Sequence, residues 1–251
     1  SLDELVEGVK KSGTHLKMIY YDACLMGMLE NLCGLTDIAD YALGAAHETP
    51  GLGGNYASLI ENLRSGSNLE TAMKQYCHEV MALWNVYGDN NDISLTDLSK
   101  LAPVTTVLGK ISNELVASYD TNEKEFNTAT CACYRLDTSY PYFDIMDYVE
   151  TLAVNSENAR LINLSSELKR AVGAAIVCIE TSKALYPQDI SWGITLVDNV
   201  AWKSLYADGT YEALAFDKAT GWSKWLKANK QVPTGNPCSS DDHEDYDNDN
   251  E

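Results

Sequence analysis

One cysteine of the sequence, Cys24, stands where its thiol could act as a nucleophile. It follows the apolar run 16–21, which predicts a buried strand, and it precedes a segment with helical periodicity. A thiol at the start of a helix faces unpaired backbone N–H groups, which stabilise a thiolate. In open α/β sheets, sites lie beyond the carboxyl ends of the strands, where Cys24 is expected. A buried structural cysteine is the competing interpretation, and by position alone it is the commoner case.

Asp22 lies two residues before Cys24. Side chains at positions i and i+2 of a strand share a face, so the carboxylate and the thiol are expected on one side. A carboxylate disfavours a neighbouring thiolate, so Asp22 is not expected to activate Cys24. It is better suited to form the base of a pocket that receives a cationic side chain. A helix cap is the alternative interpretation of this aspartate.

The elements that must position these residues alternate between strand and helix. After the predicted strand 16–21 comes a predicted helix, with apolar residues at i, i+3, i+4 and i+7 counted from Leu25. A second strand is predicted at 41–46, and a Pro/Gly-rich loop follows it over 48–54. Strand, helix and strand at this spacing form a βαβ unit, which predicts an α/β fold with a parallel sheet.

The composition restricts the possible classes of function. The 251 residues include 37 Asp+Glu and 18 Lys+Arg, which gives a formal net charge of −19. This acidity disfavours binding to nucleic acid or to an anionic membrane surface. No apolar run reaches the ~18 residues that a membrane span requires. The seven cysteines contain no C-x-x-C pair, so a disulfide scaffold is not indicated and the cellular compartment stays open.

Two regions of the chain differ in composition. Residues 1–230 are predicted to form the folded unit, and residues 231–251 a Pro/Gly segment followed by an acidic, solvated tail. Asp245, Asp247 and Asp249 of the tail have the spacing of a calcium loop but lack its glycine and its distant glutamate. Calcium is therefore a weak expectation, no cofactor is expected to be required, and no other metal site is predicted. Because the sequence opens on serine without a methionine, we expect that an N-terminal segment has been removed.

The segment around Cys24 resembles the nucleophile segment of clostripain-like cysteine peptidases, a family that belongs with the caspases, gingipains and legumains. The likeness extends over nearly the whole chain except the tail. The segments that carry it are 21–30, 46–56, 93–98, 142–148, 193–196 and 211–226. The Asp-Ala-Cys sequence at 22–24 is the most specific of them. The resemblance implies a caspase-like α/β/α sandwich with a mostly parallel central sheet.

The resemblance also implies a function and a set of site residues. The implied function is that of a cysteine endopeptidase that cleaves after Arg or Lys through a Cys–His dyad. Cys24 would be the nucleophile, and its backbone N–H would be one donor of the oxyanion hole. Asp22 would lie in the S1 pocket. His47, Glu48 and Thr49 would belong to the substrate-binding loop, with His47 at the pocket rim and Glu48 supporting basic specificity.

None of the four histidines occupies the place of the family's catalytic His-Gly segment, which lies upstream of the nucleophile. The resemblance therefore implies that this chain is the heavy chain of a self-processed precursor and that a light chain supplies the histidine. Within the chain, His47 is the more credible alternative base, because it ends the strand beside Cys24. His15 is expected at the far end of the nucleophile strand, His78 packed on a helix and His243 in the tail.

The sequence thus predicts the heavy chain of a bacterial cysteine endopeptidase, secreted or located in the periplasm or at the cell surface. Its partners would be the light chain and protein or peptide substrates that contain Arg or Lys. The alternative is a catalytically inactive caspase-like module that binds basic peptides through its acidic surface. A calcium-binding surface protein is a third and weaker interpretation.

Overall fold

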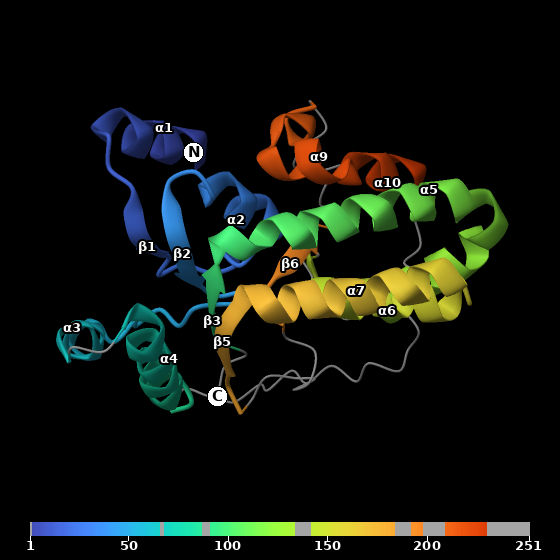
Figure 1. Ribbon diagram of the computed structural model, residues 1–251. Coiled ribbons are helices and arrows are strands. Elements are labelled where there is room, and N and C mark those ends of the chain that lie inside the picture. Colours follow the sequence, from blue (N-terminus) through green and yellow to red (C-terminus); the bar gives the residue numbers. More distant parts are fainter. Residues whose placement is uncertain are drawn as a thin grey trace.

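A computed structural model describes residues 2–65, 68–86, 91–133, 142–183, 192–197 and 209–229. Within these ranges, helices lie on both faces of a four-stranded sheet (Figure 1). The predicted tail 231–251, with its calcium-like aspartates and His243, falls outside the described residues.

The central sheet has the strand order β1-β2-β3-β5, with strands β1 (Leu16–Tyr20), β2 (Ala39–Gly44), β3 (Asp92–Asp97) and β5 (Ile176–Thr181). β1 and β2 are parallel, as the predicted βαβ unit requires. β2–β3 and β3–β5 are antiparallel. The α/β class is confirmed, but the sheet is mixed where a mostly parallel one was expected. The chain re-enters β3 beside the end of β2, with Gly44 opposite Ser94, so β3 has to run back along its neighbour.

A second, two-stranded sheet lies behind the nucleophile segment. It pairs β4 (Tyr142–Asp144) with β6 (Thr195–Val197) in antiparallel fashion. Met28 forms an isolated parallel bridge with Thr195, so the chain that follows Cys24 is attached to this sheet.

Eleven described helical segments surround the two sheets. They are α1 (Leu2–Ser12), α2 (Leu29–Leu35), α3 (Tyr56–Arg64), α4 (Leu69–Trp84), α5 (Leu101–Ala132), α6 (Ile145–Asn155), α7 (Ala159–Ala175), α9 (Ala215–Thr220) and α10 (Trp222–Ala228), and the 3₁₀ helices η1 (Leu98–Lys100) and η2 (Tyr211–Ala213). Among these helices, none is long and apolar enough to cross a lipid bilayer.

Two hydrophobic cores cover the faces of the central sheet. The larger contains Ala42 of β2 and the apolar sides of α2, α5, α6, α7, α9 and α10. The smaller contains Leu43 of β2 and the apolar side of α4. Neighbouring residues of a strand point to opposite faces, so these two residues show that the cores lie on either side of the sheet. This three-layer arrangement confirms the expected α/β/α sandwich.

Two buried carboxylates fasten the second sheet to its surroundings. Glu30 of α2 accepts hydrogen bonds from Val197 N at 3.1 Å and from the Tyr211 hydroxyl at 2.8 Å. Asp144 caps α6 through Met146 N at 2.9 Å and also accepts from Trp192 N at 2.7 Å. Each carboxylate satisfies backbone N–H groups that would otherwise be buried without a partner. Together they fix β4 and β6 behind the nucleophile segment.

Strand β1 is the edge of the central sheet, and in the described part of the chain β2 is its only neighbour. The apolar run 16–21 predicted a strand buried on both faces. None of the residues of β1 is buried, whereas every residue of β3 is. The prediction of burial is therefore wrong for this chain, because no described element covers the outer side of β1 (Figure 1).

Candidate active site

The thiol of Cys24 lies just beyond the carboxyl end of β1 and is exposed. The Thr49 backbone N–H donates to Cys24 Sγ at 3.3 Å, and the Thr49 carbonyl oxygen lies 3.7 Å from the same sulfur. These two contacts join the sulfur to the backbone of the loop. The substrate loop predicted after the second strand therefore touches the predicted nucleophile directly.

The expected helix does not begin at Cys24, which corrects the sequence-based prediction. α2 starts only at Leu29, five residues after Cys24. Leu25 has a φ of +61°, a left-handed conformation that ends helical continuity, and its N–H donates to His47 O at 2.9 Å. Gly27 N–H then donates to Ala45 O at 2.8 Å. The backbone of the segment after Cys24 pairs with residues 45–47. The backbone N–H group that contacts the Cys24 sulfur therefore comes from Thr49 and not from the start of a helix.

Glycine is required at position 27 for this pairing. A Cβ there would lie 2.8 Å from Gly193 O and 3.1 Å from the backbone of Ala46. The first distance is shorter than a Cβ atom tolerates, and the second is a tight contact with backbone atoms. The nucleophile segment can therefore pass between the central and the second sheet only with a glycine at position 27.

Asp22 is exposed, as Cys24 is, so the two side chains reach the surface at the same end of β1. Asp22 Oδ2 accepts the Gly54 N–H at 3.1 Å and the hydroxyl of Tyr56. A Cβ on Gly53 would lie 2.6 Å from the same oxygen. Asp22 is thus enclosed on one side by the loop that also holds the sulfur, and it does not cap a helix.

His47 is buried and paired with a carboxylate, which differs from its expected place at the pocket rim. Its side chain is 4% exposed, and Nδ1 lies 3.2 Å from Oδ2 of the fully buried Asp92. The backbone N–H of His47 donates to Asp92 Oδ1 at 2.8 Å. The pocket side of this segment is formed by the backbone, and the imidazole is turned toward the start of β3.

The start of β3 holds the substrate loop at two further points. The side-chain amide of Asn91 donates to Glu48 O at 3.0 Å, and the two residues form an isolated β-bridge. The carboxylate of Glu48 itself is exposed. Asn91 and Asp92 therefore fix residues 47 and 48, and through them the Thr49 backbone at the sulfur.

Replacing Asp92 by alanine is expected to lower the free energy of unfolding by about 2–4 kcal/mol, because it leaves the buried backbone N–H of His47 without its acceptor and removes the carboxylate beside the buried imidazole. Urea denaturation followed by tryptophan fluorescence measures this change. Asp97 is the matched control at the other end of β3, where its side chain accepts from Ser99 N at 3.1 Å at the surface-proximal 3₁₀ turn. Asp97→Ala is expected to cost about 1 kcal/mol, as the loss of a helix cap does. Equal costs for the two variants would contradict the role given to Asp92.

No described histidine ring contacts Cys24 Sγ. His15 Nε2 lies 2.8 Å from Asp40 Oδ1, near the start of β1 and away from Cys24, as expected. His78 is 71% exposed on α4 and 3.6 Å from Glu180, so the prediction that it packs on the helix is wrong. The residues described here thus bring together the predicted nucleophile and Asp22 but no imidazole beside them.

Cys33 provides an internal comparison for Cys24. It is 7% exposed on α2, in the larger core, as predicted. Burial, and then the charge of Glu30, raises the pKa of the Cys33 thiol to about 12. A thiol in these surroundings stays protonated and unreactive, which leaves Cys24 as the exposed thiol in the candidate site.

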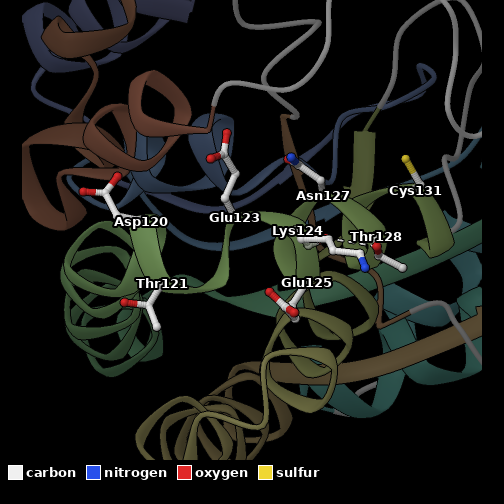
Figure 2. A pocket seen from close by; sticks show the side chains of 8 residues that line it. All are labelled: Asp120, Thr121, Glu123, Lys124, Glu125, Asn127, Thr128 and Cys131. Atoms are coloured by element: carbon white, nitrogen blue, oxygen red, sulfur yellow. Dashed lines mark hydrogen bonds between the residues drawn. The ribbon is translucent and has the colours of Figure 1, made fainter.

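Other concave and polar features of the described surface lie apart from this site. Figure 2 shows a hollow along the second half of α5, lined by Asp120, Thr121, Glu123, Lys124, Glu125, Asn127, Thr128 and Cys131. It contains none of the predicted site residues. Among the described residues, no group of three or more His, Cys, Asp or Glu side chains could hold a metal ion.

The sequence model of the clostripain family of peptidases matches residues 1–234. This chain belongs to the clostripain family. The match covers most of the chain and includes every residue of the site described above, so the family resemblance of the Asp-Ala-Cys segment is confirmed. As a member of this family, the chain is a cysteine endopeptidase. No curated protein matches it in sequence.

Several solved structures share the fold of this clostripain-family chain. A clostripain from Bacteroides thetaiotaomicron, solved with the peptide inhibitor BTN-VLTK-AOMK, is 21% identical with a TM-score of 0.66, over 88% of this chain and 94% of that one. A secreted C11 cysteine protease from the same species is 20% identical with a TM-score of 0.67, over 88% of this chain and 60% of that one. An inactive zymogen of a C11 protease from Parabacteroides distasonis is 18% identical with a TM-score of 0.66, over 88% of this chain and 62% of that one. This chain therefore spans less than two thirds of the latter two.

Sequence reasoning missed three residues of the site of this clostripain-family chain. Asp92 and Asn91 hold the substrate loop, and Tyr56 holds Asp22. Two polar residues directly ahead of the segment Ile93-Ser94-Leu95 were a signal that could have drawn attention to the start of β3. Tyr56 follows the glycines of the loop in sequence, but its bond to Asp22 spans 34 residues and no local pattern reveals it.

Proposed function

We propose that this chain is the heavy chain of a two-chain cysteine endopeptidase that cleaves after Lys or Arg. The observation that carries the proposal is the placement of Cys24 and Asp22 at one end of β1, both exposed and both held by the same loop. A nucleophile beside a carboxylate that can receive a cation suits a peptide bond that follows a basic residue. The proposed chemistry uses thiol and imidazole groups and calls for no cofactor.

The surroundings of Cys24 support acyl transfer. Thr49 N–H points at the sulfur, and in the described chain no acceptor binds the N–H of Cys24 itself. A free backbone N–H at the nucleophile is suited to the oxyanion that forms when the scissile carbonyl is attacked. Cys24 would thus supply both the attacking atom and one donor to the developing charge.

The edge of β1 supports a separate light chain. Among the described residues, no strand pairs with the outer side of β1 next to Cys24, and the apolar side chains of β1 are incompletely covered. A strand added parallel to β1 would end beside Cys24, because the carboxyl ends of parallel strands meet at one edge of a sheet. We propose that the light chain adds this strand and that its histidine lies directly after it.

The reaction follows from these positions. The light-chain imidazole takes the proton of the Cys24 thiol, and the thiolate attacks the scissile carbonyl carbon. The tetrahedral oxyanion collapses, the imidazolium gives its proton to the leaving amine, and an acyl-thioester remains on Cys24. Water then loses a proton to the imidazole and attacks the thioester, which releases the acid and the free thiol. Asp22 takes no part in these proton transfers and binds the P1 side chain.

The structural relatives support the substrate class and the compartment. The peptide of the inhibitor bound to the first of them, VLTK, ends in lysine, and the second is described as secreted. We propose by analogy a basic P1 residue and a secreted, periplasmic or cell-surface location in a bacterium.

Covalent labelling tests the proposal. The chain, together with the chain that co-purifies with it, is incubated with a peptide that ends in Lys and carries an electrophilic ketone. We expect the proteolytic fragment containing Cys24 to gain the mass of the peptidyl group. Cys33→Ala is the matched cysteine control and should be labelled fully. Reversible binding without a mass increase would overturn the peptidase proposal and favour the inactive, basic-peptide-binding module.

The same experiment assigns the base. Labelling should require the co-purifying chain and should survive His47→Gln, because His47 is turned toward Asp92. If the isolated chain is labelled and His47→Gln abolishes the labelling, the base lies in this chain and the light-chain proposal is wrong.

A further inference from the structure

The two carboxylate oxygens of Asp22 have different surroundings. Oδ2 accepts two hydrogen bonds, from Gly54 N–H at 3.1 Å and from the hydroxyl of Tyr56. In the described chain, no residue donates to Oδ1. A carboxylate oxygen offers about two lone pairs, so the two donors saturate Oδ2 and leave Oδ1 as the open acceptor.

Tyr56 is held in place by an aromatic cluster. It is the first residue of α3, and its ring centroid lies 6.2 Å from that of Tyr20. Tyr20 packs edge-on against Tyr76, with ring centroids 5.8 Å apart, and its hydroxyl oxygen accepts a hydrogen bond from the Tyr76 hydroxyl at 3.0 Å. Tyr76 is fully buried on α4, so it anchors the cluster in the smaller core. Asp22 raises the pKa of Tyr56, chiefly by accepting its hydrogen bond, so the hydroxyl remains a donor at neutral pH.

The loop on the Oδ2 side is also fixed. Trp84 Nε1 donates to Gly53 O at 3.1 Å, and Gly53 N–H donates to Pro50 O at 2.8 Å. A Cβ on Gly53 would lie 2.6 Å from Asp22 Oδ2. The loop therefore covers the side of Oδ2 that faces Gly53 and Gly54, and the Tyr56 hydroxyl occupies the remaining acceptor position of this oxygen.

We propose that Tyr56 makes the S1 pocket select lysine over arginine at P1. A guanidinium binds a carboxylate best through two parallel hydrogen bonds, one to each oxygen. An ammonium is a point charge and is satisfied by one oxygen. Since Tyr56 and Gly54 occupy Oδ2, Asp22 presents Oδ1 alone, which suits the ammonium. This inference rests on the proposed function and names the substrate preference of the same site.

Tyr56→Phe tests the inference, because it keeps the ring and removes only the hydroxyl. We measure kcat/KM with the two-chain enzyme on peptides that differ only at P1: Lys, Arg or the neutral norleucine. The wild-type enzyme should prefer Lys to Arg by about tenfold, the size of one charge-assisted hydrogen bond. In Tyr56→Phe this ratio should fall about five- to tenfold, mainly because the Arg peptide is cleaved faster. Tyr56 is 51% exposed, so the variant keeps the fold.

Tyr41→Phe is the matched control. The Tyr41 hydroxyl also donates to a carboxylate, Glu70 Oε1 at 2.9 Å, but outside the site. Its Lys-to-Arg ratio should equal that of the wild type. Competitive inhibition by butylammonium and butylguanidinium gives a second measurement that does not depend on bond cleavage, and Tyr56→Phe should favour the guanidinium.

The outcomes separate this inference from the proposed function. If the wild type prefers Arg, or if Tyr56→Phe leaves the Lys-to-Arg ratio unchanged while both peptides are cleaved, the role of Tyr56 is wrong and the basic-P1 peptidase stands. If the norleucine peptide is cleaved as fast as both basic peptides, or no peptide is cleaved, the proposed function itself is wrong.

Discussion

Cys24→Ala is expected to reduce cleavage of a Lys-terminated reporter peptide by about a thousandfold or more, since it removes the atom that attacks the carbonyl. The Cys24 side chain is exposed, so the variant should unfold at the same temperature as the wild type. Initial rates with the two-chain enzyme, together with a thermal melt, measure both quantities.

Cys33→Ala is the natural control for this result. Cys33 is a buried thiol nine residues further along, and its removal creates a small cavity in the larger core. It should lower the free energy of unfolding by about 1 kcal/mol and leave the cleavage rate intact. Full activity in Cys24→Ala, or loss of activity in Cys33→Ala with the fold preserved, would remove Cys24 from the mechanism.

Asp22→Asn is expected to lower kcat/KM for Lys and Arg peptides by about a hundredfold, which corresponds to about 3 kcal/mol for the loss of a charged partner in a binding pocket. The amide oxygen can still accept from Gly54 N–H and from Tyr56, so the loop stays in place. Cleavage of a norleucine peptide should therefore change less than about threefold. The comparison of the three peptides isolates the charge of Asp22 from its loop contacts.

Glu48→Gln separates the second acidic residue of the loop. The carboxylate of Glu48 is exposed, and exposed charges contribute little to binding, so we expect an effect of about two- to threefold on basic peptides.

An equal loss on basic and neutral peptides in Asp22→Asn would mean that Asp22 acts through the loop and not through its charge.

The local part of the site could be predicted from the sequence. The period of two along a strand placed Asp22 and Cys24 together, and the strand–helix–strand pattern gave the parallel pair of β1 and β2. The helix start could not be predicted, because the apolar spacing from Leu25 looks helical. The backbone of that segment instead pairs with residues 45–47, which is a non-local choice.

The remaining differences are non-local as well. The carboxylate partner of His47 lies 45 residues away, and the direction of β3 depends on where a connection with two helices returns. Burial of β1 was expected from apolar content alone. Apolar content predicts that a strand will be covered but does not say which chain covers it.

The outer edge of β1, which no other described strand pairs with, also affects how this chain behaves in solution. A strand edge with unpaired N–H and C=O groups and half-covered apolar side chains is a template for pairing with another strand. Lys17 is the charged residue of β1, and its ammonium forms an ion pair with Asp40 at 2.7 Å. Because its charge is paired, Lys17 opposes the pairing of this edge with another strand only weakly. Copies of the chain produced by themselves are therefore expected to pair edge to edge and self-associate as their concentration rises. Production together with the complementary strand should yield the more soluble preparation.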